Sequence, residues 1–329
     1  MVGIALRVVN LAMVIGAVWW FVRGVDLKAL GQALEQASPS LLLVAVLLNL
    51  VSQYISAQGW RIMLGPRHPV PLGRLLRYEF SAQAASAIVP GRVGELIRLW
   101  FLKQDGVPAS TTGGLIWLEK LFGAVGLAVL VAPVPWLLAD VPGVITGCIA
   151  VFAAVMAVQL GLLIVLTHRD RPEKLPKFLR GFIGGMYFLR EPRPVVTMLA
   201  LMLLGEAADV AGAVAVLHAL GIHLPLTAAV LTLFLIDLSN LLPIAPGHFG
   251  TFEVGALYAL NLGHVQPSLA LAFALLFHLQ QNLPQVAVGL PLELPLIVGR
   301  RRLRRVGDPT TESAIESGTE TAEQGMAGH

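Results

Sequence analysis

The sequence predicts an all-α polytopic membrane protein with about six to eight transmembrane helices and two re-entrant broken-helix hairpins. Of its 329 residues, 56% are hydrophobic and only 13% are charged, whereas a soluble globular chain carries about 25% charged residues. Several apolar runs exceed the roughly 18 residues that indicate a membrane span. Two further apolar runs are interrupted by a Pro-Gly pair, a pattern typical of helices that break inside a membrane.

The long apolar runs predict the membrane-spanning helices in chain order. We expect these helices at about residues 4–22, 40–60, 112–131, 142–167, 194–220 and 267–298. The first run ends in aromatic residues rather than in a small-residue cleavage site, so we expect a retained helix. Residues 1–306 are expected to form one integral membrane domain, with a first half at about 40–167 and a second half at about 194–299. The polar segment 307–329 is expected to be a disordered cytoplasmic tail.

The distribution of Lys and Arg predicts the orientation of the chain. Positive residues gather in three segments, at 61–77, 168–193 and 300–305, whereas the loops at 133–142 and 220–225 contain no Lys or Arg. Because basic loops stay on the cytoplasmic side, we expect a multi-pass protein of the bacterial inner membrane with both termini in the cytoplasm. The net charge of +3 resides at the ends of apolar runs, where anionic lipid headgroups are the expected partners and nucleic acid is not.

Two interrupted segments share one pattern, Pro-Gly-x-x-Gly, at an offset of 156 positions. The residues at these breaks are Pro90, Gly91, Gly94, Pro246, Gly247 and Gly250. In the predicted topology, segment 78–102 leaves and rejoins the cytoplasmic side, while segment 226–262 leaves and rejoins the outer side. Hairpins that enter from opposite faces are what an inverted-topology repeat requires.

The helix after the first break carries charges on one face. Arg92, Glu95 and Arg98 follow one another at three-residue spacing, which brings them together on a helix. One interpretation is that Arg92 and Arg98 bind a lipid phosphate, because a guanidinium is a planar donor of several hydrogen bonds, and that Glu95 orients them. The alternative is a surface helix whose charges lie among lipid headgroups.

Other polar side chains interrupt apolar segments, where a charge costs about 2.5–3.5 kcal/mol on insertion scales and usually serves function. The expected substrate-site residues among them are Glu79, Glu119, Asp237, Asn240 and Glu253. Glu206 and Asp209 share one face of the fifth predicted span. His278 is more simply a helix-packing residue than a proton carrier.

Signatures of catalysis are missing from the sequence. It contains no phosphate-binding P-loop, no metal-ligand spacing and no Gly-x-Ser-x-Gly nucleophile motif. We therefore expect no cofactor, no metal and no enzymatic activity.

Several of these motifs resemble one known family. They are Glu79-Phe-Ser, Val89-Pro-Gly-Arg-Val-Gly-Glu-Leu-Ile-Arg98, Glu119-Lys120, and Leu242-Pro-Ile-Ala-Pro-Gly-His-Phe-Gly250 with Glu253. Together they are similar to the lysylphosphatidylglycerol synthase transmembrane-region family, whose members are also called flippase-like domain proteins. The resemblance covers about residues 5–300 and implies a stand-alone member without the aminoacyltransferase domain.

The resemblance implies movement of a lipid between membrane leaflets. We expect a flippase that moves an anionic or phosphate-bearing lipid, with membrane lipids as its partners. Two alternatives stay open: a membrane enzyme that modifies a lipid or glycolipid, and a scaffold that docks a lipid-modifying enzyme through the basic loop 168–193.

Overall fold

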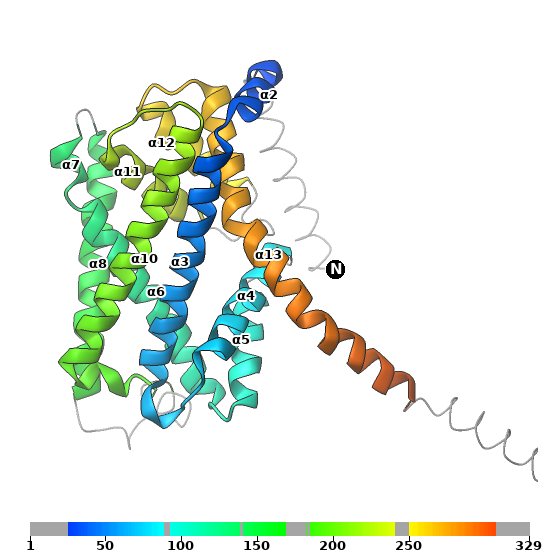
Figure 1. Ribbon diagram of the computed structural model, residues 1–329. Coiled ribbons are helices and arrows are strands. Elements are labelled where there is room, and N and C mark those ends of the chain that lie inside the picture. Colours follow the sequence, from blue (N-terminus) through cyan, green and yellow to red (C-terminus); the bar gives the residue numbers. More distant parts are fainter. Residues whose placement is uncertain are drawn as a thin grey trace, which may run out of the picture.

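The protein is seen in a computed structural model that describes residues 26–88, 93–138, 141–168, 182, 185–240 and 250–306, with side chains described as far as Leu292. Within these residues all regular secondary structure is helical. The long helices form an upright bundle, and α13 runs down its side and leaves it at an angle (Figure 1).

Among the described residues, four helices are long and apolar enough to cross a membrane. They are α3 (Pro39–Leu64), α6 (Ala109–Val131), α8 (Gly143–His168) and α10 (Pro192–Ala219). Each confirms a helix that the apolar runs predict. The first predicted span lies outside the described residues. The last predicted span is part of α13 (Pro267–Val306), one continuous helix of 40 residues.

The two broken segments form helical hairpins. α4 (Leu72–Ile88) packs against α5 (Val93–Gln104), and α11 (Leu226–Asn240) packs against α12 (Thr251–Leu262). The first pair lies at the end of the bundle where α3 ends, and the second lies at the opposite end (Figure 1). At 1.5 Å per residue, α5 and α12 are each about 18 Å long, well short of a hydrocarbon core of about 30 Å. Residues 89–92 and 241–249, with Pro90, Gly91, Arg92, Pro246 and Gly247, lie outside the described residues.

A glycine closes each hairpin. A Cβ atom at Gly94 would lie 2.1 Å from the carbonyl oxygen of Ala82, and a Cβ atom at Gly255 would lie 2.7 Å from that of Leu235. Gly250, which the sequence pattern pairs with Gly94, instead precedes α12 with φ of 91°, a conformation that glycine adopts without strain. Gly94 and Gly255 thus each pack closely against the preceding helix of their hairpin, and the alignment of Gly94 with Gly250 in a repeat stays a prediction.

Short helices complete the ends of the bundle. α2 (Leu27–Gln36) begins after Asp26, whose Oδ1 accepts hydrogen bonds from the backbone nitrogens of Lys28 at 2.9 Å and Ala29 at 3.2 Å. α7 (Val134–Leu137) and the 3-10 helices η1 (Gly65–Arg67) and η3 (Tyr187–Arg190) join the long helices.

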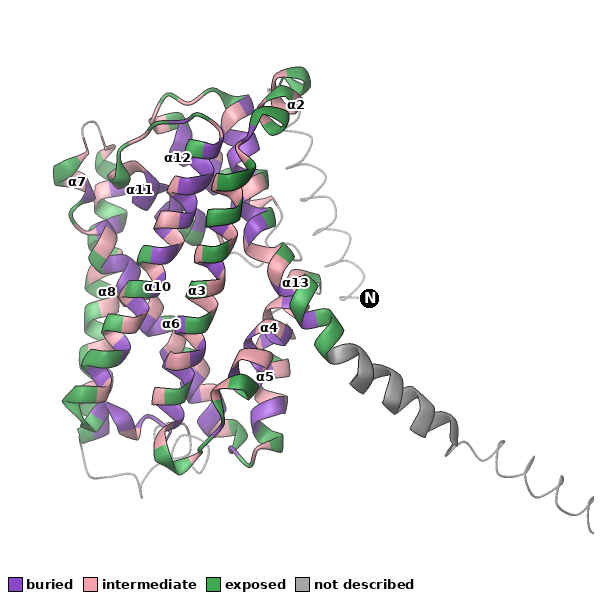
Figure 2. Cartoon of the chain, viewed as in Figure 1, coloured by how far each residue is buried: buried purple, intermediate pink, exposed green. Residues whose placement is uncertain are grey.

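The buried side chains form two apolar clusters, one at each end. One cluster contains the hairpin α11–α12 with the adjoining ends of α6, α8 and α10. The other joins α4 and α5 to the opposite ends of α3, α6 and α10. Exposed positions run along α8, whose apolar sequence is only 11% buried (Figure 2). Such an apolar, exposed helix surface is suited to contact with lipid.

Candidate functional site

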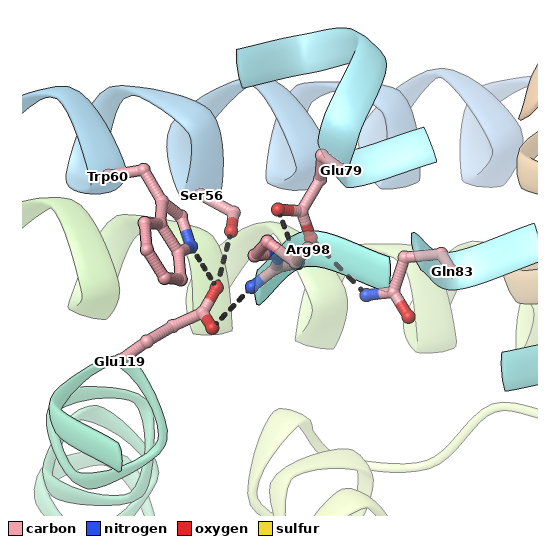
Figure 3. Close-up of polar contacts among 6 residues, drawn as sticks. All are labelled: Ser56, Trp60, Glu79, Gln83, Arg98 and Glu119. Atoms are coloured by element: carbon pink, nitrogen blue, oxygen red, sulfur yellow. Dashed lines mark hydrogen bonds and ion pairs between the residues drawn. The ribbon is translucent and has the colours of Figure 1, made fainter. Parts of the chain in front are cut away.

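Arg98 of α5 forms a buried ion-pair cluster with two carboxylates (Figure 3). Its Nη2 lies 2.7 Å from Oε2 of Glu79 on α4, and its Nη1 lies 2.6 Å from Oε2 of Glu119 on α6. Arg98 is only 7% exposed and Glu79 only 2%. The bifurcated guanidinium suits this task because its terminal nitrogens point toward two acceptors at once.

The second oxygen of Glu119 joins α3 to the same cluster. Glu119 Oε1 accepts hydrogen bonds from Trp60 Nε1 at 2.8 Å and from Ser56 Oγ at 3.1 Å. The guanidinium carbon of Arg98 also lies 4.9 Å from the centroid of the Trp60 ring, within cation–π range. Glu79 Oε1 accepts a longer hydrogen bond of 3.4 Å from Gln83. The cluster thus connects α3, α4, α5 and α6.

This geometry gives Arg98 a structural role, which the sequence does not predict. Each terminal nitrogen of Arg98 donates one of its two N–H groups to a carboxylate, so two of the five N–H donors of the guanidinium are used in these ion pairs. Among the described residues, Arg98 Nε is a buried donor without a hydrogen-bond partner. The two ion pairs of Arg98 hold the first hairpin against α3 and α6, and phosphate binding by this side chain stays a prediction.

The other charges near the first break occupy different places. Glu95 is half-buried, and the ion pairs of Arg98 go to Glu79 and Glu119 rather than to Glu95. Arg92 lies outside the described residues. Lys120 is exposed, on a different side of α6 from its neighbour Glu119.

Glu253 anchors the second hairpin. Its Oε2 accepts a hydrogen bond of 2.6 Å from the backbone nitrogen of Gly250, which satisfies a free donor at the start of α12. Its Oε1 lies 2.9 Å from Nδ1 of His278 on α13, and the His278 ring stacks on Phe252 at 4.4 Å. Because a carboxylate only accepts, Nδ1 of His278 carries the proton. The structure thus places Glu253 in a contact between α12 and α13.

Asn240 and Asp237 lie near the break on α11. Asn240 Oδ1 accepts a hydrogen bond of 3.2 Å from Thr251 Oγ1 and so links α11 to α12. Asp237 is exposed on the helix surface. Its negative charge repels the carboxylate of Glu206 on α10, whereas the positive charge of Lys120 attracts that carboxylate.

Glu206 and Asp209 extend this group of acids. Asp209 accepts a hydrogen bond of 3.0 Å from Ser52 Oγ. Its negative charge, like that of Asp237, repels the carboxylate of Glu206. Glu206 packs against α6, where a Cβ at Gly126 would lie 3.2 Å from its Cγ. We call Glu206, Asp209 and Asp237 the acidic group. Within the described residues, no three His, Cys, Asp or Glu side chains are arranged to hold a metal ion.

The sequence predicts three members of the ion-pair cluster as site residues, namely Glu79, Arg98 and Glu119. It does not indicate the two residues of α3 that bind Glu119. Ser56 and Trp60 lie one turn apart on one face of α3, and that spacing is their only signal in the sequence. Glu206 and Asp209 are visible as a shared helix face, yet only the fold shows that Asp237 lies near them.

The sequence matches a protein-family model over most of its length. The model of the lysylphosphatidylglycerol synthase TM region matches residues 7–289 of the chain. The comparison with curated proteins gives no match. The matched segment contains both hairpins and every residue of the ion-pair cluster and the acidic group. The chain belongs to the lysylphosphatidylglycerol synthase transmembrane-region family, a family of membrane proteins tied to lipid handling.

Proposed function

We propose that the protein is a lipid translocase, which moves the polar headgroup of a phosphate-bearing lipid between the leaflets of the inner membrane. The observation that carries the proposal is the concentration of charged side chains inside an apolar bundle, beside two hairpins whose second helices, α5 and α12, are each about 18 Å long. Charges at membrane depth are costly and typically line the route of a polar substrate.

The placement of the two hairpins also supports translocation. Each consists of two packed helices that start and end on the same side of the bundle, and the two pairs lie at opposite ends (Figure 1). We interpret them as re-entrant hairpins of an inverted repeat, with both chain termini in the cytoplasm. In transporters with this organisation the substrate binds near the membrane centre, at the breaks.

The two polar groups have different roles in this proposal. In the Arg98 cluster both terminal nitrogens of Arg98 bind carboxylates, so the cluster fixes the first hairpin against α3 and α6. The acidic group consists of three carboxylates, of which Asp237 is exposed, and Lys120 is the cation that attracts Glu206. Polar atoms of a passing headgroup, such as hydroxyl and amine donors, would hydrogen-bond to these carboxylates while the lipid tails remain in the bilayer.

Reconstitution tests the proposal. Purified protein is placed in liposomes of phosphatidylcholine and phosphatidylglycerol that contain a fluorescent phosphatidylglycerol or a fluorescent polyprenyl phosphate. A translocase makes inner-leaflet probe accessible to an external quencher without changing the probe's mass. A new lipid mass would instead indicate a membrane enzyme. Unchanged sidedness and unchanged mass of both probes would contradict the translocase and favour a scaffold.

A further inference from the structure

A small cavity lies at the end of the bundle where α3 ends. Its volume is about 50 Å³, and its walls come from the end of α3, from η1, from the start of α6 and from the segment at 185–187. The residues that line it are Met63, Leu64, Arg67, His68, Thr111, Leu115, Gly185 and Tyr187. Leu64 and Leu115 lie one helical turn, about 6 Å, from Trp60 and Glu119 of the ion-pair cluster. The cavity is therefore a neighbour of that cluster and not part of it.

Arg67 gives the cavity its charge. Its guanidinium carbon lies 3.9 Å from the centroid of the Tyr187 ring. This cation–π contact does not pair the N–H groups of Arg67 with a hydrogen-bond acceptor atom, so they can bind an anion. Arg67 makes no ion pair within the part of the chain that the structure describes. None of the described residues that line the cavity is acidic.

The remaining polar groups of the wall suit an anion as well. The ring of His68 supplies a further donor, and the hydroxyl groups of Tyr187 and Thr111 can donate or accept. The Tyr187 hydroxyl lies 3.5 Å from the carbonyl oxygen of Leu64, a weak hydrogen bond that a better acceptor could replace.

Two glycines bring the walls of the cavity together. Gly65 has φ of 56°, and a Cβ there would lie 1.9 Å from the Tyr187 hydroxyl. A Cβ at Gly185 would lie 2.8 Å from Cγ2 of Thr111. A side chain at Gly65 would displace the Tyr187 hydroxyl and strain the backbone, and one at Gly185 would press on Thr111, so this arrangement favours glycine at both positions.

We propose that Arg67, His68 and Tyr187 form a binding site for a phosphate group, separate from the ion-pair cluster and the acidic group. A tetrahedral phosphate presents several oxygens to a guanidinium that offers parallel N–H donors. The volume accommodates a phosphate group and excludes a whole nucleotide. The same chemistry is offered by the headgroup of an anionic phospholipid and by free inorganic phosphate. This site stands independently of lipid translocation.

Binding measurements on the full chain in detergent test this proposal with two probes. Phosphatidic acid is added and its retention is followed by native mass spectrometry, with diacylglycerol as the matched lipid without phosphate. Inorganic phosphate is titrated by calorimetry. We expect Arg67→Gln to weaken binding of at least one probe by about tenfold or more, which is about 1.4 kcal/mol. Loss of phosphatidic acid binding alone identifies a lipid headgroup site, and loss of inorganic phosphate binding identifies a free-anion site.

The matched control is Arg61→Gln, which removes another exposed arginine near the end of α3 that does not line the cavity. Tyr187→Leu is the second test variant, because it removes the ring on which Arg67 stacks but keeps every charge. Melting temperatures show that each variant folds. The proposal is overturned if Arg67→Gln and Tyr187→Leu bind both probes as Arg61→Gln does. If Arg67→Gln does not fold, Tyr187→Leu alone decides.

Discussion

Arg98 and Trp60 donate hydrogen bonds to the two oxygens of the same carboxylate, that of Glu119. Arg98 Nη1 donates to Oε2 of Glu119, and Trp60 Nε1 donates to Oε1. The guanidinium carbon lies 4.9 Å from the centroid of the indole ring. One buried carboxylate therefore fixes the position of α5 relative to α3 and α6. Loss of the cation would leave two carboxylates buried without a counter-charge.

Arg98→Gln is expected to destabilise the folded protein by about 3–5 kcal/mol, because breaking one side of a buried ion pair leaves uncompensated charge. The measurement is thermal or denaturant unfolding in detergent. Arg61→Gln is the control. The combined variant Glu79→Gln/Arg98→Gln/Glu119→Gln should recover much of the loss, since no charge is then buried. A stable Arg98→Gln protein would contradict the structural role of the cluster.

Gly94→Ala and Gly255→Ala are each expected to separate the helices of one hairpin. The added methyl groups would overlap carbonyl oxygens at 2.1 Å and 2.7 Å, and overpacking of this kind costs about 1–3 kcal/mol. Gly113→Ala on α6 and Gly147→Ala on α8 are matched controls, because a Cβ there meets nothing within 4 Å. Equal melting temperatures for all four variants would show that the hairpins are not closed at these glycines.

His278→Ala is expected to loosen the second hairpin from α13. The substitution leaves Glu253 Oε1 without its partner in a buried position, at a cost of about 1–3 kcal/mol. Unfolding in detergent measures this loss. His223→Ala, which changes an exposed histidine in the loop before α11, should have little effect. A similar loss in both variants would refute a specific Glu253–His278 contact.

The position of the spans follows from the sequence because membrane helices obey strong local rules. Runs of apolar residues predict α3, α6, α8 and α10 within a few residues of their ends, and the Pro-Gly pairs separate α4 from α5 and α11 from α12. Glu79, Arg98 and Glu119 stand out because charges are rare in such runs. The choice of partners does not follow, since it depends on helices that meet only in the folded bundle.

The correspondence between the two hairpins shows the limit of motif spacing. Ala82 and Gly94 are 12 positions apart, whereas Leu235 and Gly255 are 20 apart. The second break is therefore longer, and a fixed offset aligns Gly94 with Gly250 rather than with Gly255. Close packing against the preceding helix, which spacing does not encode, is instead shared by Gly94 and Gly255. For the same reason Glu253 resembles a substrate residue in sequence and forms a helix contact in the structure.

Opposite entry of the two hairpins can be tested by cysteine labelling. Cys148 is the single cysteine of the sequence, so Cys148→Ser provides a cysteine-free background. Gln104→Cys and Asn261→Cys place exposed thiols at the ends of α5 and α12. In right-side-out vesicles we expect an impermeant maleimide to label Asn261→Cys and not Gln104→Cys, and inside-out vesicles should give the reverse. Labelling of both from one side would contradict an inverted repeat.

The acidic group should matter for transport more than for stability. Asp237→Asn removes one of several carboxylates that repel one another, so the melting temperature should stay unchanged or rise. Asp26→Asn, far from this group at the start of α2, is the charge-matched control. A large loss of stability in Asp237→Asn alone would show that the acids are structural.

The most direct measurement is the rate at which fluorescent phosphatidylglycerol or polyprenyl phosphate becomes accessible to an external quencher in proteoliposomes. We predict a clear acceleration by the wild-type protein and the Asp26→Asn control, without a change in probe mass. The Asp237→Asn variant should move the probe more slowly by about tenfold or more, which corresponds to an activation free energy higher by about 1.4 kcal/mol. Rates equal to those of protein-free liposomes for both probes would contradict the translocase, and equal rates for Asp237→Asn and wild type would remove the acidic group from the lipid path.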